Sequence, residues 1–249
     1  MKLTKKNIVI DEVDISYLDN EQLNKKTLLF VHGWGADKYN LAAIYNFLSI
    51  DYRVIAVDLP GFGESGLNDK ITDAFSYSVI ISKFIEKLGI KKVNYIGHSF
   101  GGKIGIILAS KNRDLIDKLV LVNSSGLKPK RNPLWYLKVY SFKILKFFYT
   151  IIIRDKEKIE KFKNRFGSTD YKNSGRLRKI LVNTVNEDLT NLISEINIPT
   201  FLYWGDKDRD TPIWMAKKMN ILIKDSGLYI VKNGGHFSFV DDNRIINII

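Results

Sequence analysis

The chain has 249 residues, of which 45% are hydrophobic, and its 39 Lys and Arg against 27 Asp and Glu give a formal net charge of +12. This length predicts one domain, or one domain with an insertion, with enough apolar residues for a large core. The absence of cysteine excludes disulfides, thiol catalysis and metal sites built on Cys.

The N-terminal region predicts two strands, over residues 3–10 and 14–19, because apolar and polar residues alternate there. Lysines are frequent in the first six residues. No apolar stretch of signal-peptide length follows them, so we expect a cytoplasmic protein.

Two apolar runs, residues 27–31 and 52–57, predict buried strands. A glycine-rich loop follows each of them, over residues 32–35 and 58–66. The second loop contains a G-x-G-x-x-G pattern that starts at Gly61, as in dinucleotide-binding turns. No helix is predicted to begin at these glycines, and no Asp or Glu ends the next strand at the required distance. We therefore interpret it as a structural loop.

Residues 93–109 combine a short apolar run, a tight turn and a helical pattern. The turn, residues 97–101, reads G-H-S-F-G, a G-x-S-x-G sequence. A Ser at the tip of such a turn is forced into a strained backbone conformation, and the flanking glycines let strand and helix approach closely. The helix N-terminus behind it presents N–H groups to a developing negative charge. This context predicts that Ser99 is a nucleophile.

The remaining elements are predicted as alternating helices and strands. They are a helix over 72–88, a strand over 118–122, a strand over 200–204, a helix over 212–223 and a strand over 228–231. With the strands above, the prediction is eight strands. Strands that alternate with helices are typical of a parallel sheet with crossover helices, so the predicted fold class is α/β.

The alternation stops between residues 127 and 195. Residues 127–180 contain 16 Lys and Arg against 4 Asp and Glu, so this segment carries the whole net charge of the chain. Residues 134–153 are nearly all apolar or aromatic and predict a helix whose three lysines fall within about 140° of arc. Three lysines in its middle make a membrane span too costly, so none is expected. We expect the apolar face of this helix to line an acyl pocket, with contact to an anionic membrane surface as the alternative.

Four motifs together resemble the α/β-hydrolase superfamily. They are HGWG at 32–35, DLPGFGES at 58–65, the G-x-S-x-G turn and GGH at 234–236. The resemblance covers nearly the whole chain. It implies an α/β-hydrolase fold, with a mostly parallel eight-stranded sheet flanked by helices.

The resemblance also implies a domain division. Residues 1–126 and 196–249 would form the catalytic domain. Residues 127–195 would form a helical cap, inserted between the sixth and seventh strands, where this family carries its cap.

An activated Ser needs a general base, and the chain has three His. His98 adjoins Ser99 on the turn, so its side chain should point away from it. His32 ends an inner strand, where packing of the loop is the expected role. His236 follows the last strand on a glycine-rich loop that can reach back over the edge of the sheet. Elimination and family position both assign His236 as the base.

The base needs a carboxylate, and the loop after the seventh strand has three alternating aspartates between residues 206 and 210. A calcium loop is excluded, because its sixth and twelfth positions are Thr and Lys in place of Gly and Glu. The resemblance implies that Asp208 is the acid, with Asp206 as the alternative. Some relatives place the acid after the sixth strand, where this chain has the uncharged Asn123.

The resemblance implies that Ser99, Asp208 and His236 form a triad and that the N–H groups of Trp34 and Phe100 form the oxyanion hole. The expected activity is hydrolysis of a carboxylic ester or similar acyl bond through an acyl-enzyme, with no cofactor and no metal. A C–C bond hydrolase, lactonase, thioesterase or acyltransferase would use the same triad. A non-catalytic ligand-binding fold and a membrane-surface module are the remaining alternatives.

The expected partner is a small ester-like molecule with an apolar acyl group. No recognition motif for nucleic acid accompanies the positive charge, so nucleic acid is not expected. Peripheral contact with an anionic membrane through the basic insertion stays open, and the sequence does not set the oligomeric state.

Overall fold

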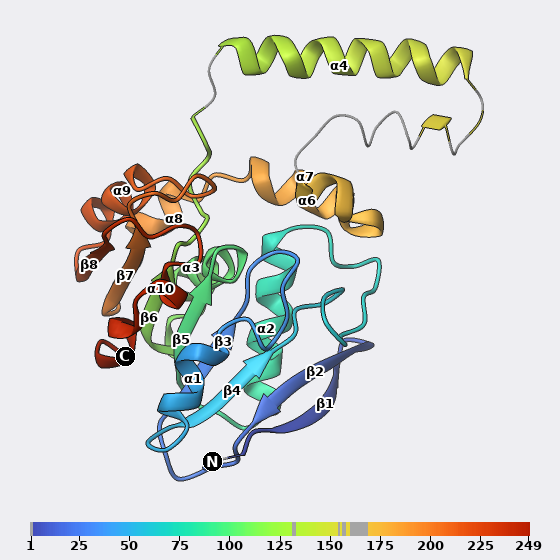
Figure 1. Ribbon diagram of the computed structural model, residues 1–249. Coiled ribbons are helices and arrows are strands. Elements are labelled where there is room, and N and C mark those ends of the chain that lie inside the picture. Colours follow the sequence, from blue (N-terminus) through green and yellow to red (C-terminus); the bar gives the residue numbers. More distant parts are fainter. Residues whose placement is uncertain (1, 131–132, 154, 156–157, 160–168) are drawn as a thin grey trace. The chain divides into compact units, whose positions relative to one another are not determined.

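The computed structural model describes residues 2–130, 133–153, 155, 158–159 and 169–249 (Figure 1). The chain divides into two compact units. The first unit consists of residues 1–127 and 187–249, and the second of residues 128–186.

The first unit is built on an eight-stranded sheet of order β1-β2-β4-β3-β5-β6-β7-β8. Its strands are β1 (Thr4–Ile10), β2 (Val13–Asp19), β3 (Thr27–Val31), β4 (Arg53–Val57), β5 (Val93–His98), β6 (Ile116–Val122), β7 (Thr200–Gly205) and β8 (Ser226–Val231). Strand β2 is antiparallel to both of its neighbours, β1 and β4, and the six strands β3 to β8 pair in parallel. The carboxyl ends of those six strands therefore meet at one edge of the sheet.

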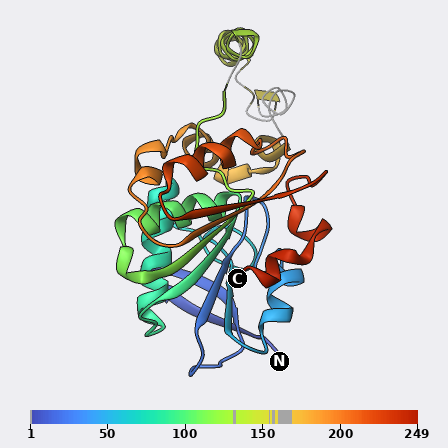
Figure 2. The ribbon, with the colours of Figure 1, turned by 90° about the vertical axis from the view of Figure 1, so that its left-hand side faces the viewer.

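Helices cover both faces of this sheet, as Figure 2 shows. The helices of the first unit are α1 (Ala42–Leu48), α2 (Ala74–Lys87), α3 (Phe100–Lys111), α8 (Thr190–Ser194), α9 (Trp214–Leu222) and α10 (Ser238–Asp241), with the 3₁₀ turns η1 (Arg113–Leu115) and η3 (Asn243–Asn247). Helices α2 and α3 lie on one face, and α1 and α10 on the other (Figure 2). The predicted α/β fold, a mostly parallel eight-stranded sheet flanked by helices, is confirmed.

Local sequence explains the ends of α2. The side chain of Asp73 accepts a hydrogen bond from the Ser76 N–H at 2.8 Å, and the Ser76 hydroxyl accepts one from the Asp73 N–H at 3.1 Å. The two bonds form a capping box. Gly89 follows the helix with φ +68°, a conformation that glycine adopts without steric cost.

Helix α1 was not predicted. Its seven residues bury only Ile44, Tyr45 and Leu48, and so short a helix is marginal by itself. Those side chains join a core cluster with Phe239 and Ile245 from the end of the chain. Tertiary packing, more than local sequence, therefore stabilises this helix.

The second unit contains α4 (Pro133–Ile152), α6 (Thr169–Asn173), the 3₁₀ turn η2 (Gly175–Leu177) and α7 (Arg178–Asn186). Helix α4 corresponds to the helix predicted over residues 134–153. Among the residues that the structure describes, no helix is both long enough and apolar enough to span a membrane.

Where the chain re-enters the first unit, residues 187–189 bond to other parts of that unit. The Leu189 N–H donates to the Gly126 carbonyl at 2.8 Å, and Glu187 Oε1 accepts from the Ala74 N–H at 3.1 Å. The buried Lys103 ammonium lies 3.4 Å from Glu187 Oε2. The sequence predicted residues 187–195 as part of the cap. In the structure they belong to the unit that contains the sheet.

Candidate active site

Ser99 lies on the turn between β5 and α3, with φ +50° and ψ −109°. A non-glycine residue in this region is strained and needs surrounding structure to hold it there. A Cβ on Gly97 would lie 2.6 Å from the Gly101 carbonyl carbon, and one on Gly101 only 2.2 Å from the Val31 oxygen. Both positions therefore require glycine, because strand and helix approach too closely for a side chain.

Backbone hydrogen bonds hold Ser99 in this strained conformation. Its N–H donates to the Val122 carbonyl at 3.0 Å, and its carbonyl accepts from the Ser125 N–H at 3.0 Å. The Ser125 hydroxyl donates to the same carbonyl at 3.2 Å. The turn after β6 thus fixes the turn that carries the predicted nucleophile.

The loop after β3 lies against this turn. A Cβ on Gly33 would be 3.1 Å from Ser99 Cβ, so glycine permits the close approach. The rings of Trp34 and Phe100 pack edge to face, with centroids 5.4 Å apart. The two residues predicted to supply the oxyanion hole are therefore neighbours.

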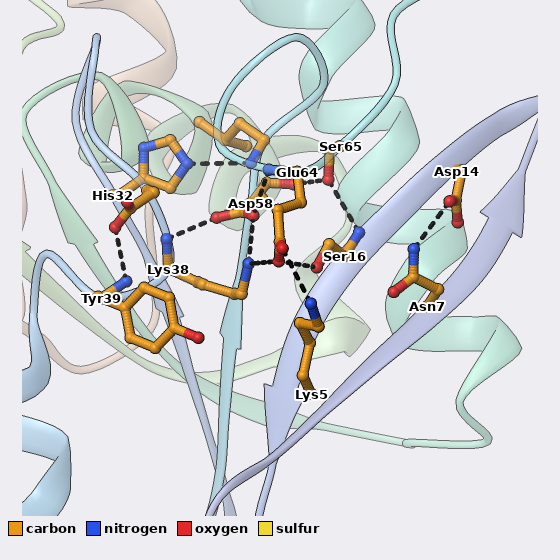
Figure 3. Close-up of polar contacts among 12 residues, drawn as sticks. Lys5, Asn7, Asp14, Ser16, His32, Lys38, Tyr39, Asp58, Glu64 and Ser65 are labelled. Carbon is orange, nitrogen blue, oxygen red and sulfur yellow. Dashed lines mark hydrogen bonds and ion pairs between the residues drawn. The ribbon is translucent and has the colours of Figure 1, made fainter.

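A polar network centred on the buried Lys38 and Asp58 anchors the same loop to the one that follows β4 (Figure 3). Lys38 Nζ donates to Asp58 Oδ2 at 2.7 Å and to Glu64 Oε2 at 2.6 Å. The Lys38 N–H donates to Asp58 Oδ1 at 2.6 Å, and the Glu64 N–H to Asp58 Oδ2 at 2.9 Å. Burial opposes the charged lysine, but its bonds to Asp58 and Glu64 outweigh burial and raise the pKa of Lys38. The contacts agree with a structural role for the loop of residues 58–66.

We expect Lys38→Met to lower the free energy of unfolding by about 3 kcal/mol, because it leaves the Asp58 carboxylate buried without its cation. Urea unfolding followed by circular dichroism measures the change. Lys5→Met is the control, since Lys5 bonds to Glu64 at 2.9 Å in an ion pair about half exposed, and such pairs contribute little. Equal losses in the two variants would contradict a special role for the buried pair.

His236 and Asp208 come together at the sheet edge. His236 Nδ1 lies 2.9 Å from Asp208 Oδ2, and the Asp208 side chain is inaccessible to solvent. Asp208 Oδ2 also accepts from the Thr211 hydroxyl at 2.7 Å, while Oδ1 accepts from the N–H groups of Asp210 at 2.8 Å and Thr211 at 3.0 Å. Burial would raise the pKa of Asp208, but the bonds from His236 and Thr211 outweigh it and hold the pKa below its usual value. Asp208 is therefore an anion, and its Oδ2 accepts a hydrogen bond from His236 Nδ1.

Asp206, the alternative acid, is placed differently. Its N–H donates to the Val231 carbonyl at 3.1 Å, which continues the pairing of β7 with β8. Its Oδ1 is buried without a hydrogen-bond partner among the described residues. Of the two aspartates, only Asp208 has a hydrogen bond to His236 in the described part of the chain.

The other two histidines have packing roles. His98 Nε2 donates to the His236 carbonyl at 2.9 Å. Burial is the main cause that lowers the pKa of His98, to about 3, and the charge of a protonated His236 nearby is the second. His98 therefore stays neutral. His32 Nδ1 donates to the Gly33 carbonyl at 2.7 Å, while its Nε2 accepts from the Leu59 N–H at 3.0 Å. Burial lowers the pKa of His32 as well.

Sequence reasoning gave no role to three polar residues around Asp208 and His236: Asn123, Thr211 and Ser238. Asn123 Nδ2 donates to Asp208 Oδ2 at 2.7 Å, and the Ser238 hydroxyl donates to Asn123 Oδ1 at 2.5 Å. All three side chains are buried. The only signal in the sequence was the position of Asn123 after a predicted strand.

Asp208, Asp210 and His236 each place one ligand atom within 4.8 Å of the others, a grouping able to hold a metal ion. The oxygens of Asp208, however, already accept hydrogen bonds from Asn123, Thr211, Asp210 and His236. We therefore interpret these residues as an acid–base pair with its supports.

The architecture and this constellation define a hydrolase of the α/β class. A family model described as the alpha/beta hydrolase fold matches residues 26–243. The chain belongs to this family and is an α/β-hydrolase enzyme.

Several named proteins are similar to this chain. Lipase 3 of Moraxella sp. is 27% identical over 90% of this chain and 76% of its own length. The pimeloyl-[acyl-carrier protein] methyl ester esterase of Vibrio atlanticus is 25% identical over 86% of this chain and 89% of its own. Among solved structures, a serine hydrolase involved in carbazole degradation is 20% identical, covers 99% of this chain and 97% of its own, and has a TM-score of 0.75.

Proposed function

We propose that the protein is a serine hydrolase that cleaves a carboxylic ester through Ser99, His236 and Asp208. The observation that carries the proposal is the 2.9 Å hydrogen bond between His236 Nδ1 and the buried Asp208 carboxylate. It occurs at the sheet edge where the strained Ser99 follows β5. An acid–base pair and a Ser on such a turn, at the same edge of a parallel sheet, are the arrangement of acyl-transfer enzymes.

In the proposed reaction, Ser99 Oγ attacks the ester carbonyl carbon while its proton passes to His236 Nε2. The carbonyl π electrons move to oxygen and form the oxyanion. When the tetrahedral intermediate collapses, the bond to the leaving alcohol breaks and the alcohol takes the proton from Nε2. Water then attacks the acyl-enzyme by the same steps, and the carboxylic acid and free Ser99 are released.

The N–H groups of Trp34 and Phe100 would hold the oxyanion. Their ring contact at 5.4 Å and the close approach of Gly33 to Ser99 support this assignment. Phe100 begins α3, so its amide is at the positive end of a helix dipole. Loss of one such donor costs roughly 10²–10³ in turnover in comparable enzymes.

The names of two relatives, a lipase and a methyl ester esterase, favour an ester as the substrate. Lactonase, thioesterase, acyltransferase and C–C hydrolase reactions use the same groups and remain alternatives. A panel of chromogenic esters with graded acyl length, assayed beside thioesters and lactones, tests the proposal. Hydrolysis of esters at the highest kcat/KM supports it, and a lack of ester turnover contradicts it.

The insertion is proposed to act as the cap. Residues 128–186 carry 16 Lys and Arg against 4 Asp and Glu, while the first unit is neutral overall. A shared bias toward Lys would affect both units, so this separation of charge points to a role of the second unit. We propose that its apolar residues contact the acyl group of the substrate, and peripheral binding to an anionic membrane is the second candidate.

We expect medium-chain esters to be cleaved with a higher kcat/KM than short-chain esters, with little change between low and high salt, because contacts between apolar groups involve no charges for the salt to screen. Charge steering would instead weaken with salt, since exposed charges are screened over about 10 Å at 0.1 M. The assay uses neutral esters at both salt concentrations.

Co-sedimentation with neutral and with anionic lipid vesicles serves as the control. Activity that is indifferent to chain length, together with salt-sensitive binding to anionic vesicles alone, would favour the membrane role over the acyl contact.

A further inference from the structure

Asn123 occupies an unusual position directly after β6. Its φ is +45°, in the left-handed region, and its side chain is fully buried. Asn tolerates this region better than most residues. Its N–H donates to the Tyr203 carbonyl of β7 at 2.9 Å. The strained conformation turns its side chain toward the loops that follow β7 and β8.

The carboxamide of Asn123 has a partner for each of its polar groups. Nδ2 donates one hydrogen to Asp208 Oδ2 at 2.7 Å and the other to the Gly235 carbonyl at 3.2 Å. Oδ1 accepts from the Ser238 hydroxyl at 2.5 Å. Gly235 directly precedes His236, so one planar amide connects the acid to the backbone of the base.

The same short turn also holds the nucleophile. Val122 accepts the hydrogen bond of the Ser99 N–H, and Ser125 donates two to the Ser99 carbonyl. Residues 122–125 therefore contact the loops of all three proposed catalytic residues. The three loops come from different strands, and this turn lies between them.

We propose that Asn123 is a positioning residue that sets the distance and orientation between Asp208 and His236. This inference rests on the proposed function of Ser99, Asp208 and His236. The planar amide fixes the angle between its two donated hydrogen bonds, so the acid carboxylate and the His236 backbone cannot shift independently. The Ser238 hydroxyl holds the amide in the orientation that points Nδ2 at Asp208. An Asp at this position would place a second carboxylate against Asp208, which like-charge repulsion disfavours.

The test compares Asn123→Ala with Asn20→Ala. Asn20 is a matched control, because its Nδ2 donates to the carbonyls of Ser49 and Tyr52 at 3.0 Å each and its Oδ1 accepts from the Val54 N–H at 3.0 Å. It lies near the start of β4, at the opposite edge of the sheet. We expect Asn123→Ala to lower kcat by roughly 10- to 100-fold with little change in KM, since small misplacements of catalytic groups have costs of this size. Asn20→Ala should leave both unchanged.

Proton NMR of the His236 Nδ1–H supplies a readout that stability does not affect. The downfield resonance expected for a proton shared with the Asp208 carboxylate should shift or disappear in Asn123→Ala and persist in Asn20→Ala. Ser238→Ala, which removes only the donor to Asn123 Oδ1, should give an intermediate loss of kcat and keeps the test valid if Asn123→Ala does not fold.

The outcomes separate this inference from the proposed function. If the wild type reacts with a fluorophosphonate at Ser99 but Asn123→Ala and Ser238→Ala keep the kcat and resonance of Asn20→Ala, the positioning role is wrong. A wild type that neither reacts nor hydrolyses esters would overturn the proposed function, and the positioning role with it.

Discussion

Ser99→Ala should lose ester hydrolysis by roughly 10⁶-fold, the size of effect seen when a serine protease loses its nucleophile. The variant lacks the oxygen that forms the acyl-enzyme, so the loss should appear in kcat. A fluorophosphonate probe, which reacts with an activated serine, should label the wild type at Ser99 and leave the variant unlabelled. Mass spectrometry of the labelled peptide locates the modified residue.

Ser110→Ala is the matched control for this experiment. Ser110 is a buried serine on α3, the helix that follows Ser99, and its hydroxyl donates to the Ile107 carbonyl at 3.0 Å. The control variant should label and turn over as the wild type does. Equal labelling of the wild type and Ser99→Ala would show that the nucleophile is another residue.

Asp208→Asn should lower kcat by about 10⁴-fold, as the corresponding change does in a serine protease. The amide keeps the shape of the side chain but removes the negative charge beside His236 Nδ1. Because an amide nitrogen cannot accept a hydrogen bond, the imidazole is then free to adopt the wrong tautomer. Steady-state kinetics with a medium-chain ester measures the loss.

Asp206→Asn distinguishes the two aspartates of the same loop. The described contacts of Asp206 lead to the Val231 backbone, away from His236. Its substitution should therefore change kcat far less than Asp208→Asn. If Asp206→Asn were the more damaging change, the acid would be assigned to the wrong residue.

Short-range features were predictable from the sequence. The G-x-S-x-G turn identifies Ser99 as the candidate nucleophile, because the strand before it, the strained turn and the helix after it are consecutive in the sequence. The predicted strand over residues 27–31 has the same bounds as β3 (Thr27–Val31). The order of Ser99, Asp208 and His236 along the chain could likewise be read from motifs, since each follows a strand at its carboxyl end.

The choice between Asp206 and Asp208 needed the fold. Both carboxylates follow β7 within a few residues, and the sequence separates them only by resemblance. In the structure, Asp206 still continues the pairing with β8, while Asp208 lies beyond the turn and meets His236, 28 residues further along the chain. Backbone geometry, which depends on the pairing of β7 with β8, decides which carboxylate reaches His236.

The supports of the candidate site were decided by tertiary structure alone. Asn123 bonds to Asp208 across 85 residues of sequence and to Ser238 across 115. Lys38 meets Asp58 only because β3 and β4 pair in parallel and bring their loops to one edge. A sequence pattern records spacing along the chain, whereas these polar groups are buried by strands that are neighbours in space. Burial then requires each of them to find a partner, and those partners hold the proposed catalytic groups in place.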